Sequence, residues 1–191
     1  MKRDKDVFLQ GKYVALKALN ESDVENSDWY DWFNDEETTK YMQKHYYPNT
    51  KAEQMDYWKN HIKGSRDRLQ LGIYDTNGGP LLGCVGLYPI DYINRKAEIS
   101  TIIAEKSTRN VKYFFESNKL ILQHAFYSLN LYRVYGGSIV KEFAEAMCKF
   151  YGFEIEGVMR SEVYKNGKYH DTYLIGLMES EFKFRKEFVH E

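Results

Sequence analysis

The sequence has little cysteine, little proline and almost no net charge. It contains 2 cysteines and 3 prolines in 191 residues, and its formal net charge is −1. Cys84 and Cys148 lie too far apart in the sequence for a metal-ligand or redox pair, which favours two buried, reduced thiols. The lack of a basic excess argues against a nucleic-acid partner. The 5 histidines show no metal-ligand spacing, so we expect no metal.

Long apolar runs and linker sequences are also missing. No apolar stretch approaches the length that spans a bilayer, and residues 1–10 lack the apolar segment of a signal peptide. No repeat and no linker rich in Pro, Gly or Ser divides the chain. We therefore expect one domain over residues 1–191, in a soluble, cytoplasmic protein without a membrane partner. The sequence leaves open whether that protein forms a homodimer.

Aromatic residues, by contrast, are abundant. The chain has 17 Tyr, 11 Phe and 3 Trp. Packing in the core is the common use of such residues, because each one buries a large apolar area. Tyrosines also suit the walls of a binding cleft, since the ring is apolar and the hydroxyl is polar. Composition alone does not separate the two uses.

The hydrophobic pattern changes between strand and helix periods along the chain. Two turn sequences, at residues 75–79 and 165–168, contain Asn-Gly and are typical of hairpins. Gly152 is placed to end a helix in the left-handed conformation. We expect strands over 12–19, 69–74, 81–87, 96–104 and 133–139, and two more within 153–178. We expect two short helices within 24–43, separated at Asn34–Asp35, and a helix that begins at a cap at Asn49 or Thr50 and ends at Ile62. Two further helices are expected over 111–129 and 143–151.

The order of these elements predicts the fold class. A strand–helix–strand crossover lies in the middle of the chain, and hairpins lie on either side of it. This order favours an α/β (α+β) fold, with a mixed, mostly antiparallel sheet of about seven strands and helices on both faces.

The most specific sequence signal lies between residues 152 and 174. It comprises Gly152-Phe153, Glu156-Gly157, Arg160, Asn166-Gly167-Lys168 and Asp171-Thr172-Tyr173-Leu174. This series resembles the segment that closes the domain in the ribosomal-protein N-acetyltransferase-like branch of the GNAT superfamily. Residues 131–134 and 97–99 are similar to segments at the fifth and fourth strands of that branch. The resemblance covers about residues 13–178 and leaves 179–191 as a C-terminal tail.

The resemblance implies a single-domain GNAT fold and an acetyl-CoA-dependent N-acetyltransferase. In such enzymes a primary amine attacks the thioester carbonyl of acetyl-CoA directly, and coenzyme A leaves. The implied partners are therefore coenzyme A and a small-molecule amine. Two alternatives stay open: a protein N-terminal acetyltransferase, and a catalytically degenerate binding module with the same fold.

The resemblance places the pyrophosphate of acetyl-CoA at residues 109–114, where a glycine-rich loop enters a helix. Backbone N–H groups and the helix dipole bind the anion there, and small residues let the backbone approach it. The two small positions hold Lys112 and Phe114 instead. Either Lys112 supplies charge to a phosphate, or it is a solvated lysine and the cofactor affinity is weak or lost. The implied cofactor contacts are Ile102, Ile103, Arg109, Asn110, Val111, Lys112, Tyr113, Phe114 and Lys141.

The candidate acid–base residues follow from the same resemblance. Glu98 matches an acidic position on the fourth strand and is the candidate base, with a pKa that burial would raise. Asp91, on a nearby loop, is a second candidate. Many members place the proton donor where this chain has Cys148, whose thiol is either that acid or a small buried apolar group.

The segment from Trp29 to Met42 is similar to one found in members that act on amino sugars. It reads Trp29-x-x-Trp32-Phe33-Asn34-Asp35, followed by Thr38-Thr39-x-Tyr41-Met42. The similarity favours an amino-sugar nucleotide as the acceptor, with Trp32, Asn34 and Tyr41 in contact with it. Aromatic and acidic residues on a helix are also typical of plain packing.

Overall fold

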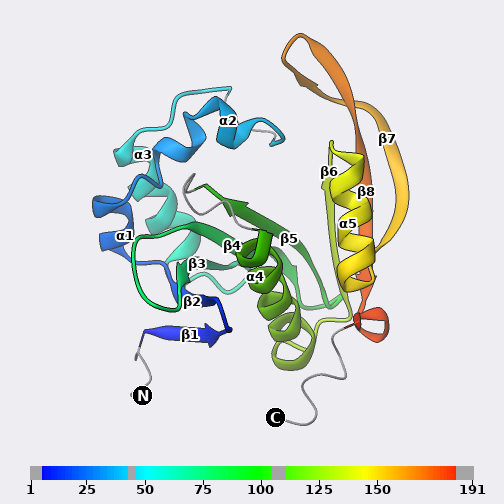
Figure 1. Ribbon diagram of the computed structural model, residues 1–191, viewed down its shortest axis with the longest axis horizontal. Helices are drawn as coiled ribbons and strands as arrows, with labels where there is room; N and C mark the ends of the chain where they lie inside the picture. The colour runs from blue at the N-terminus through cyan, green and yellow to red at the C-terminus, as the bar shows by residue number, and fades with distance from the viewer. Residues whose placement is uncertain (1–5, 43–45, 105–110, 184–191) are drawn as a thin grey trace.

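Figure 1 shows the computed structural model of the chain, which describes residues 6–42, 46–104 and 111–183. Eight strands form one sheet in the order β1-β2-β3-β4-β5-β6-β8-β7. Neighbouring strands are antiparallel except β5 and β6, which are parallel, so the predicted mixed, mostly antiparallel sheet is confirmed. The strands are β1 (Val7–Gln10), β2 (Val14–Ala18), β3 (Leu69–Asp75), β4 (Gly83–Asp91), β5 (Lys96–Ile103), β6 (Arg133–Ser138), β7 (Glu154–Lys165) and β8 (Lys168–Met178).

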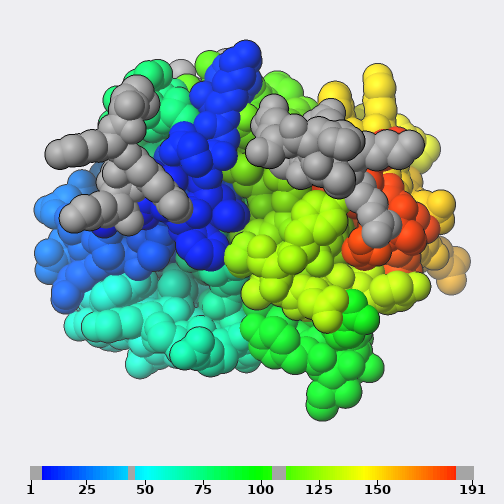
Figure 2. All heavy atoms as spheres, turned by 90° about the horizontal axis from the view of Figure 1, so that it is seen from below, coloured from blue at the N-terminus to red at the C-terminus, as the bar shows by residue number. Residues whose placement is uncertain are grey.

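The sheet has one strand more than the predicted seven, because the predicted strand 12–19 is preceded by β1. The tight turn between β1 and β2 is held from outside the sheet. Glu116 accepts hydrogen bonds from the backbone N–H groups of Lys12 at 2.9 Å, Tyr13 at 2.5 Å and Val14 at 2.8 Å. Figure 2 shows this N-terminal part lying against the segment that follows α4, where the ring centroids of Phe8 and His124 are 5.0 Å apart.

Helices cover both faces of the sheet, as predicted (Figure 1). Alternate residues of a strand point to opposite faces. Val85 and Leu87 of β4 accordingly pack in one core with α4, whereas Cys84 packs in a second core with the tryptophans of the other face. The helices are α1 (Glu21–Asn26), α2 (Glu36–Thr39) and α3 (Lys51–Tyr57) on one face, and α4 (Val111–Gln123) and α5 (Lys141–Tyr151) on the other.

The two short helices predicted within 24–43 are shorter in the structure than predicted. The structure has α1, a single 3-10 turn at Asp31–Phe33, and α2. Local capping explains the fragmentation. Asn20 forms a capping box that starts α1, and the Asp35 carboxylate accepts from the Thr38 N–H to start α2. The break predicted at Asn34–Asp35 is correctly placed.

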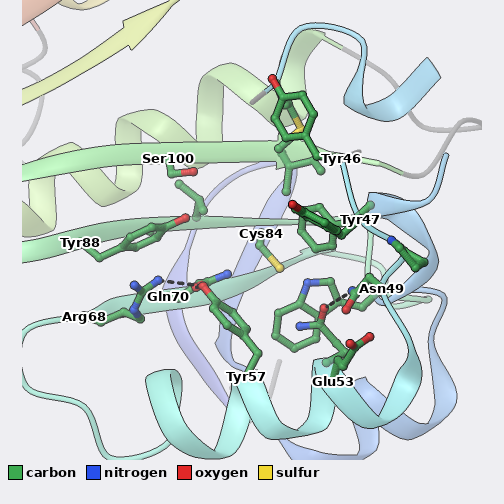
Figure 3. Close-up of a pocket in the computed structure, with 18 residues that line it drawn as sticks. Tyr46, Tyr47, Asn49, Glu53, Tyr57, Arg68, Gln70, Cys84, Tyr88 and Ser100 are labelled. Carbon is green, nitrogen blue, oxygen red and sulfur yellow. Dashed lines mark hydrogen bonds between the residues drawn. The ribbon is translucent and has the colours of Figure 1, made fainter. Parts of the chain in front are cut away.

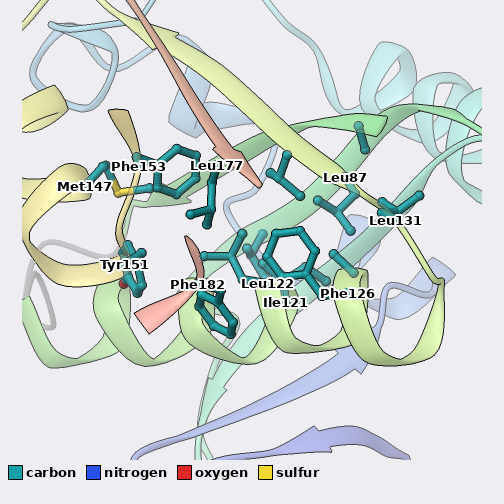
Figure 4. Close-up of a cluster of buried hydrophobic side chains, with 14 of the residues drawn as sticks. Leu87, Ile121, Leu122, Phe126, Leu131, Met147, Tyr151, Phe153, Leu177 and Phe182 are labelled. Atoms are coloured by element: carbon teal, nitrogen blue, oxygen red, sulfur yellow. The ribbon is translucent and has the colours of Figure 1, made fainter. Parts of the chain in front are cut away.

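The larger core fills the space between the sheet and the pair α4–α5 (Figure 4). Phe115 of α4 packs on Phe150 of α5 with ring centroids 4.1 Å apart, and the Tyr151 hydroxyl donates to the Phe115 carbonyl at 2.8 Å. Phe182 packs on Phe126 with centroids 5.4 Å apart. The start of the predicted C-terminal tail therefore belongs to this core.

β5 and β6 separate after three residue pairs. Residues 96–98 of β5 pair with residues 133–135 of β6, and no pairing between the two strands follows. Figure 1 shows them diverging from there, on the side where α4 and α5 begin. Within the described residues, the β6-facing backbone edge of residues 99–103 consequently bonds to no other strand. Backbone groups on such an edge can bind an extended ligand.

The β7–β8 hairpin turns at the predicted Asn-Gly step. Asn166 and Gly167 have φ angles of 51° and 80°, the left-handed conformation that a two-residue hairpin turn needs. Near its tip, Lys165 Nζ donates to the backbone carbonyls of Thr39 and Met42 at 2.5 Å each. The hairpin therefore fixes the segment that follows α2.

Candidate active site

A cavity of about 640 Å³ opens on the α1–α3 face of the sheet, next to β3, β4 and β5 (Figure 3). This volume accommodates a small-molecule ligand. Four tyrosines line the cavity, which confirms the cleft interpretation for part of the tyrosine content, while Tyr113 and Tyr151 are core residues. The aromatic wall consists of Trp29, Phe33, Tyr46, Tyr47, Tyr57 and Tyr88.

One end of the cavity carries a positive charge. The Arg68 guanidinium lies over the Tyr88 ring, 3.9 Å from its centroid, and Nη1 donates to the Tyr57 hydroxyl at 2.8 Å (Figure 3). Tyr57 in turn donates to Gln70 Oε1 at 3.3 Å. Burial raises the pKa of Tyr57 to about 12, so its hydroxyl stays neutral near pH 7. This network fixes the direction of the guanidinium and leaves it charged.

The wall formed by α3 contains an amide group with an unused donor. Asn49 Nδ2 donates to Gln54 Oε1 at 3.0 Å, and Asn34 holds the Asn49 backbone through bonds of 2.7 and 2.8 Å. Gln54 is 2% exposed, and its Nε2 has no hydrogen-bond partner in the described part of the chain. A buried donor without an acceptor is costly. An acceptor atom of a ligand in the cavity, which Gln54 lines, would satisfy this donor.

Glu98 is the last residue of β5 that pairs with β6, and it is not among the residues that line the cavity. Its side chain is on the same face of β5 as Ser100 and Ile102, two cavity residues, because alternate residues share a face. Partial desolvation raises the pKa of Glu98 above the ordinary carboxyl value, although the side chain keeps contact with solvent. A carboxylate with a raised pKa is a better proton acceptor than an ordinary one.

Tyr135 of β6 is a neighbour of Glu98 that the sequence did not indicate. The two residues form the last pair between the parallel strands. Desolvation raises the pKa of Tyr135, and the negative charge of Glu98 raises it further. Strand register alone places Tyr135 beside Glu98, so no local pattern could have revealed this neighbour.

Asp91, the second candidate base, closes the turn between β4 and β5. Its carboxylate accepts from the backbone N–H groups of Ile93 at 3.0 Å and Asn94 at 2.9 Å and from Asn94 Nδ2 at 2.6 Å. The Asn94 side chain and backbone lower the pKa of Asp91. A base needs the opposite change, so this geometry favours Glu98.

Cys148, the candidate acid, is half-buried on α5 and packs against the larger core. Burial raises the pKa of its thiol. The charges that act on it are those of Lys183, Glu145 and Glu154, and Lys183 Nζ donates to the Cys148 carbonyl at 3.1 Å. Cys148 does not line the cavity. A role as proton donor stays a prediction.

The predicted acceptor contacts belong to a segment that borders the cavity, but they lie behind or outside the cavity wall. Trp32 is buried in the second core, Asn34 acts through Asn49, and Tyr41 is 60% exposed. None of the three lines the cavity, whereas Trp29 and Phe33 do. The reason is that residues 31–33 form a 3-10 turn, so the face predicted for a regular helix is not the one presented.

The predicted cofactor contacts lie in different parts of the structure. Ile102 lines the cavity, Ile103 faces α4, and Val111 is exposed at the first described residue of that helix. Lys141 begins α5 and pairs with Glu145 at 3.3 Å. Arg109 and Asn110 lie outside the described residues.

The three remaining positions, at the start of α4, carry contacts of their own. Lys112 Nζ lies 5.0 and 4.9 Å from the ring centroids of Tyr13 and Tyr113, and the Tyr113 hydroxyl bonds to the Asp75 carboxylate. Phe114 meets Phe143, in the first turn of α5, edge to face with centroids 5.5 Å apart. The first turns of α4 and α5 are thus joined by aromatic rings.

Solved structures share this architecture. A spermidine N-acetyltransferase from Vibrio cholerae, in complex with CoA and spermine, matches with a TM-score of 0.79 at 24% identity over 90% of this chain and 98% of the other. A spermidine/spermine N-acetyltransferase, SpeG, from the same organism, in complex with manganese ions, matches with a TM-score of 0.70 at 25% identity, covering 88% and 94%. The split sheet with helices on both faces is therefore the GNAT fold.

The sequence agrees with the fold. The Acetyltransferase (GNAT) domain family matches residues 14–155, and the chain belongs to that family. The match ends before most of the closing series at 152–174, so other residues of the chain carry the membership.

Two proteins of Bacillus subtilis (strain 168) are related to the chain. One, described as "Putative ribosomal N-acetyltransferase YdaF", is 34% identical over 115 residues, which are 60% of this chain and 61% of that protein. The other, "Uncharacterized N-acetyltransferase YoaA", is 29% identical over 107 residues, or 54% and 59%. The chain thus spans about three-fifths of the length of these relatives.

Both cysteines are free thiols, as predicted, with Cys84 buried and Cys148 half-buried. No helix within the described ranges combines the length and the apolar character needed to cross a bilayer. Over the same ranges, His, Cys, Asp and Glu side chains form no group of three that could hold a metal ion.

Proposed function

We propose that the protein is an acetyl-CoA-dependent N-acetyltransferase that acetylates a primary amine of a small molecule. The position of Glu98 carries the proposal. This residue lies at the last pair before β5 and β6 separate, on the face of β5 that continues into the cavity. A thioester reaching through the separated strands and an amine held in the cavity would meet at this point. Membership in the GNAT family supports the same reaction.

Glu98 takes up the proton that the amine loses. The amine nitrogen bonds to the thioester carbonyl carbon, the carbon–sulfur bond breaks, and coenzyme A leaves as a thiolate. The ammonium proton passes to Glu98 directly or through a water molecule. Tyr135 keeps its proton near pH 7 because its pKa is raised, and it or Cys148 protonates the thiolate. Holding both reactants in place contributes roughly 7–11 kcal/mol in favourable cases.

The donor side of the site fits acetyl-CoA in part. The free edge of β5 suits a chain with amide groups, because such a chain can bond to a strand edge as another strand would. Lys112 and Lys141 place positive charge near the starts of α4 and α5. The contact between Phe114 and Phe143, by contrast, lies between these helices and would have to open or be bypassed. It is also the observation that favours the alternative, a degenerate binding module.

The acceptor within this proposal is an amino-sugar nucleotide or a similar small amine. A cavity of about 640 Å³ with aromatic walls suits a ring that stacks on tyrosine or tryptophan. A protein N-terminus is the second candidate, and the description of the relative YdaF as a ribosomal N-acetyltransferase is what favours it.

The proposal is tested by two measurements on the purified protein. Acetyl-CoA should raise the melting temperature, because a ligand that binds the native state stabilises it. A panel of primary amines, including amino sugars and their nucleotides, should release free coenzyme A thiol when the protein is added. An unchanged melting temperature at millimolar acetyl-CoA would contradict the proposed function. A shift without thiol release from any amine or N-terminal peptide would identify a binding module.

A further inference from the structure

We infer that the acceptor amine belongs to an anionic molecule, whose carboxylate or phosphate oxygens bind Arg68 and Gln54 inside the aromatic cavity. The inference rests on the proposed function and narrows its acceptor to one chemical class. Neither residue lies in the segment that the sequence associates with the acceptor, which ends at Met42. Arg68 directly precedes β3, and Gln54 lies in α3.

The charge of Arg68 is directed into the cavity without an acidic partner. Its planar group lies on the face of Tyr88 and bonds to the neutral Tyr57 hydroxyl. No carboxylate of the described residues forms an ion pair with it. An arginine held flat in this way presents its remaining N–H groups in the fork geometry that carboxylate and phosphate oxygens match.

Glu53, an acidic residue that lines the cavity, helps to cap the N-terminus of α3. Its carboxylate accepts from Thr50 N and Thr50 Oγ1 at 2.8 Å each, which caps α3, and these two bonds lower the pKa of Glu53. Thr50 rather than Asn49 is therefore the cap. Glu53 keeps its negative charge, but its oxygens are bonded to Thr50 at the helix end, and Figure 3 shows it at the opposite end of the cavity from Arg68. The positive charge on the cavity lining is that of Arg68.

Gln54 supplies an independent observation on the same wall. Its oxygen is occupied by Asn49, and its Nε2 is the buried donor that has no acceptor in the described part of the chain. A ligand oxygen would satisfy this group, whereas an ammonium group would not, since both are donors. The cavity therefore combines two hydrogen-bond donors with walls of aromatic side chains. This combination favours binding of an anionic molecule that contains a ring and disfavours binding of a linear polycation.

Matched pairs of probes test the inference. Glucosamine 1-phosphate and glucosamine differ by a phosphate, and tyrosine and tyramine differ by a carboxylate; spermidine serves as the polycation. Calorimetric binding without acetyl-CoA is measured first, because it does not depend on turnover. The wild-type protein should bind the phosphate-bearing or carboxylate-bearing member of one pair about tenfold to a hundredfold more tightly than the member without that group. The pair that shows the preference tells phosphate from carboxylate.

Three variants and one control locate the site. Arg68→Gln should abolish the preference, so that the two members of a pair bind with about equal affinity, and Arg68→Lys should retain part of the preference. Gln54→Glu keeps the bond from Asn49 but replaces the free donor with negative charge, so it should weaken the anionic probe more than the neutral one. Arg66→Gln removes an exposed arginine that does not line the cavity and should leave the preference unchanged. Melting temperatures check that each variant is folded.

The outcomes separate the inference from the proposed function. Equal binding of both members in each pair, tighter binding of spermidine, or a preference that survives Arg68→Gln in a folded protein overturns the inference. Absence of binding by every probe overturns it as well. Preferential anion binding that is lost in Arg68→Gln upholds it, even if no probe is acetylated. The failure to acetylate any amine would then count against the proposed function alone.

Discussion

The two sides of the candidate site differ in how completely the chain is built around a ligand. On the acceptor side, α3 is capped by Thr50, Asn49 holds Gln54, and Lys165 fixes the segment after α2 from the tip of a distant hairpin. On the donor side, the first turn of α4 carries Lys112 and Phe114 where the family resemblance expects small residues. The acceptor side thus has directed donors and aromatic walls, while the donor side has side chains that pack on one another.

This difference indicates which of the two proposed ligands, the acceptor or acetyl-CoA, has the better preorganised binding site. A cavity with an oriented guanidinium and an unused buried amide donor is prepared for its ligand before the ligand arrives. A helix start whose rings meet those of the neighbouring helix has to lose that contact before a phosphate chain can pass between them. We therefore expect acceptor recognition to be specific and acetyl-CoA binding to be weak.

Replacement of Glu98 should have the largest effect, because this residue is the proposed base. Glu98→Gln should lower kcat by about 100- to 10,000-fold, since proton uptake by a positioned base contributes that much. Binding of acetyl-CoA and of the acceptor should change little. Thiol-release kinetics and calorimetry on the same preparation check both statements. Unchanged turnover would rule Glu98 out as the base, and Asp91→Asn is the matched control.

The pH dependence of the wild-type protein should report the same residue. Desolvation raises the pKa of Glu98, and the deprotonated form is the active base. The value of kcat/KM should therefore rise with pH through that pKa, by about tenfold per pH unit below it, and level off above it. Rates across a pH series, with stability checked at each pH, measure the profile. A profile that Glu98→Gln leaves unaltered would assign the titration to another group.

Removal of the Lys165 ammonium should damage the acceptor side alone. Lys165→Met leaves the carbonyls of Thr39 and Met42 without their charged donor, and hydrogen bonds to a charged group contribute about 1.5–3 kcal/mol. We expect KM for the acceptor to rise about tenfold, while the affinity for acetyl-CoA is unchanged. Lys168→Met, at the exposed end of the same hairpin, is the control. An equal loss on both sides would show that the hairpin supports the whole fold rather than the cavity.

Replacement of Phe114 should act on the donor side with the opposite sign. Phe114→Ala removes the edge-to-face contact with Phe143, and such pairs contribute about 0.5–1.5 kcal/mol. Acetyl-CoA should then bind about two- to tenfold more tightly by calorimetry, since less contact energy opposes its entry. Phe150→Ala removes a ring near the other end of α5 and should leave the affinity as it is. Weaker binding in Phe114→Ala would mean that the ring contacts the cofactor.

Replacement of Lys112 should have the smallest effect. Its ammonium lies over the rings of Tyr13 and Tyr113 and also acts on Asp75, so little of its charge is reserved for a phosphate. We expect Lys112→Ala to weaken acetyl-CoA binding by about two- to fivefold, as for an exposed ion pair. If Lys112→Ala bound acetyl-CoA at low salt as tightly as the wild-type protein does, Lys112 would not contact a phosphate. A loss of affinity larger than about fivefold would make Lys112 a principal contact of the cofactor.

Much of the fold could be predicted because it depends on neighbours in the chain. The Asn-Gly turn at 166–167, the break at Asn34–Asp35 and the helix end at Gly152 follow from residues that favour one backbone conformation. The segment 29–42 contributes Trp29, Phe33 and Met42 to the cavity lining. Trp32, Asn34 and Tyr41 do not line the cavity, since residues 31–33 form a 3-10 turn, which presents a different face from a helix.

The sequence by itself determined the family, the sheet with helices on both faces, and Glu98 as the candidate base. Only the tertiary structure decided what surrounds that base. Strand register placed Tyr135 beside Glu98, and the packing of α3 against the sheet brought Gln54 and Arg68 into one cavity. The physical reason is that periodicity and turn chemistry act over a few residues. Which side chains share a cavity depends on contacts between elements that are far apart in the chain.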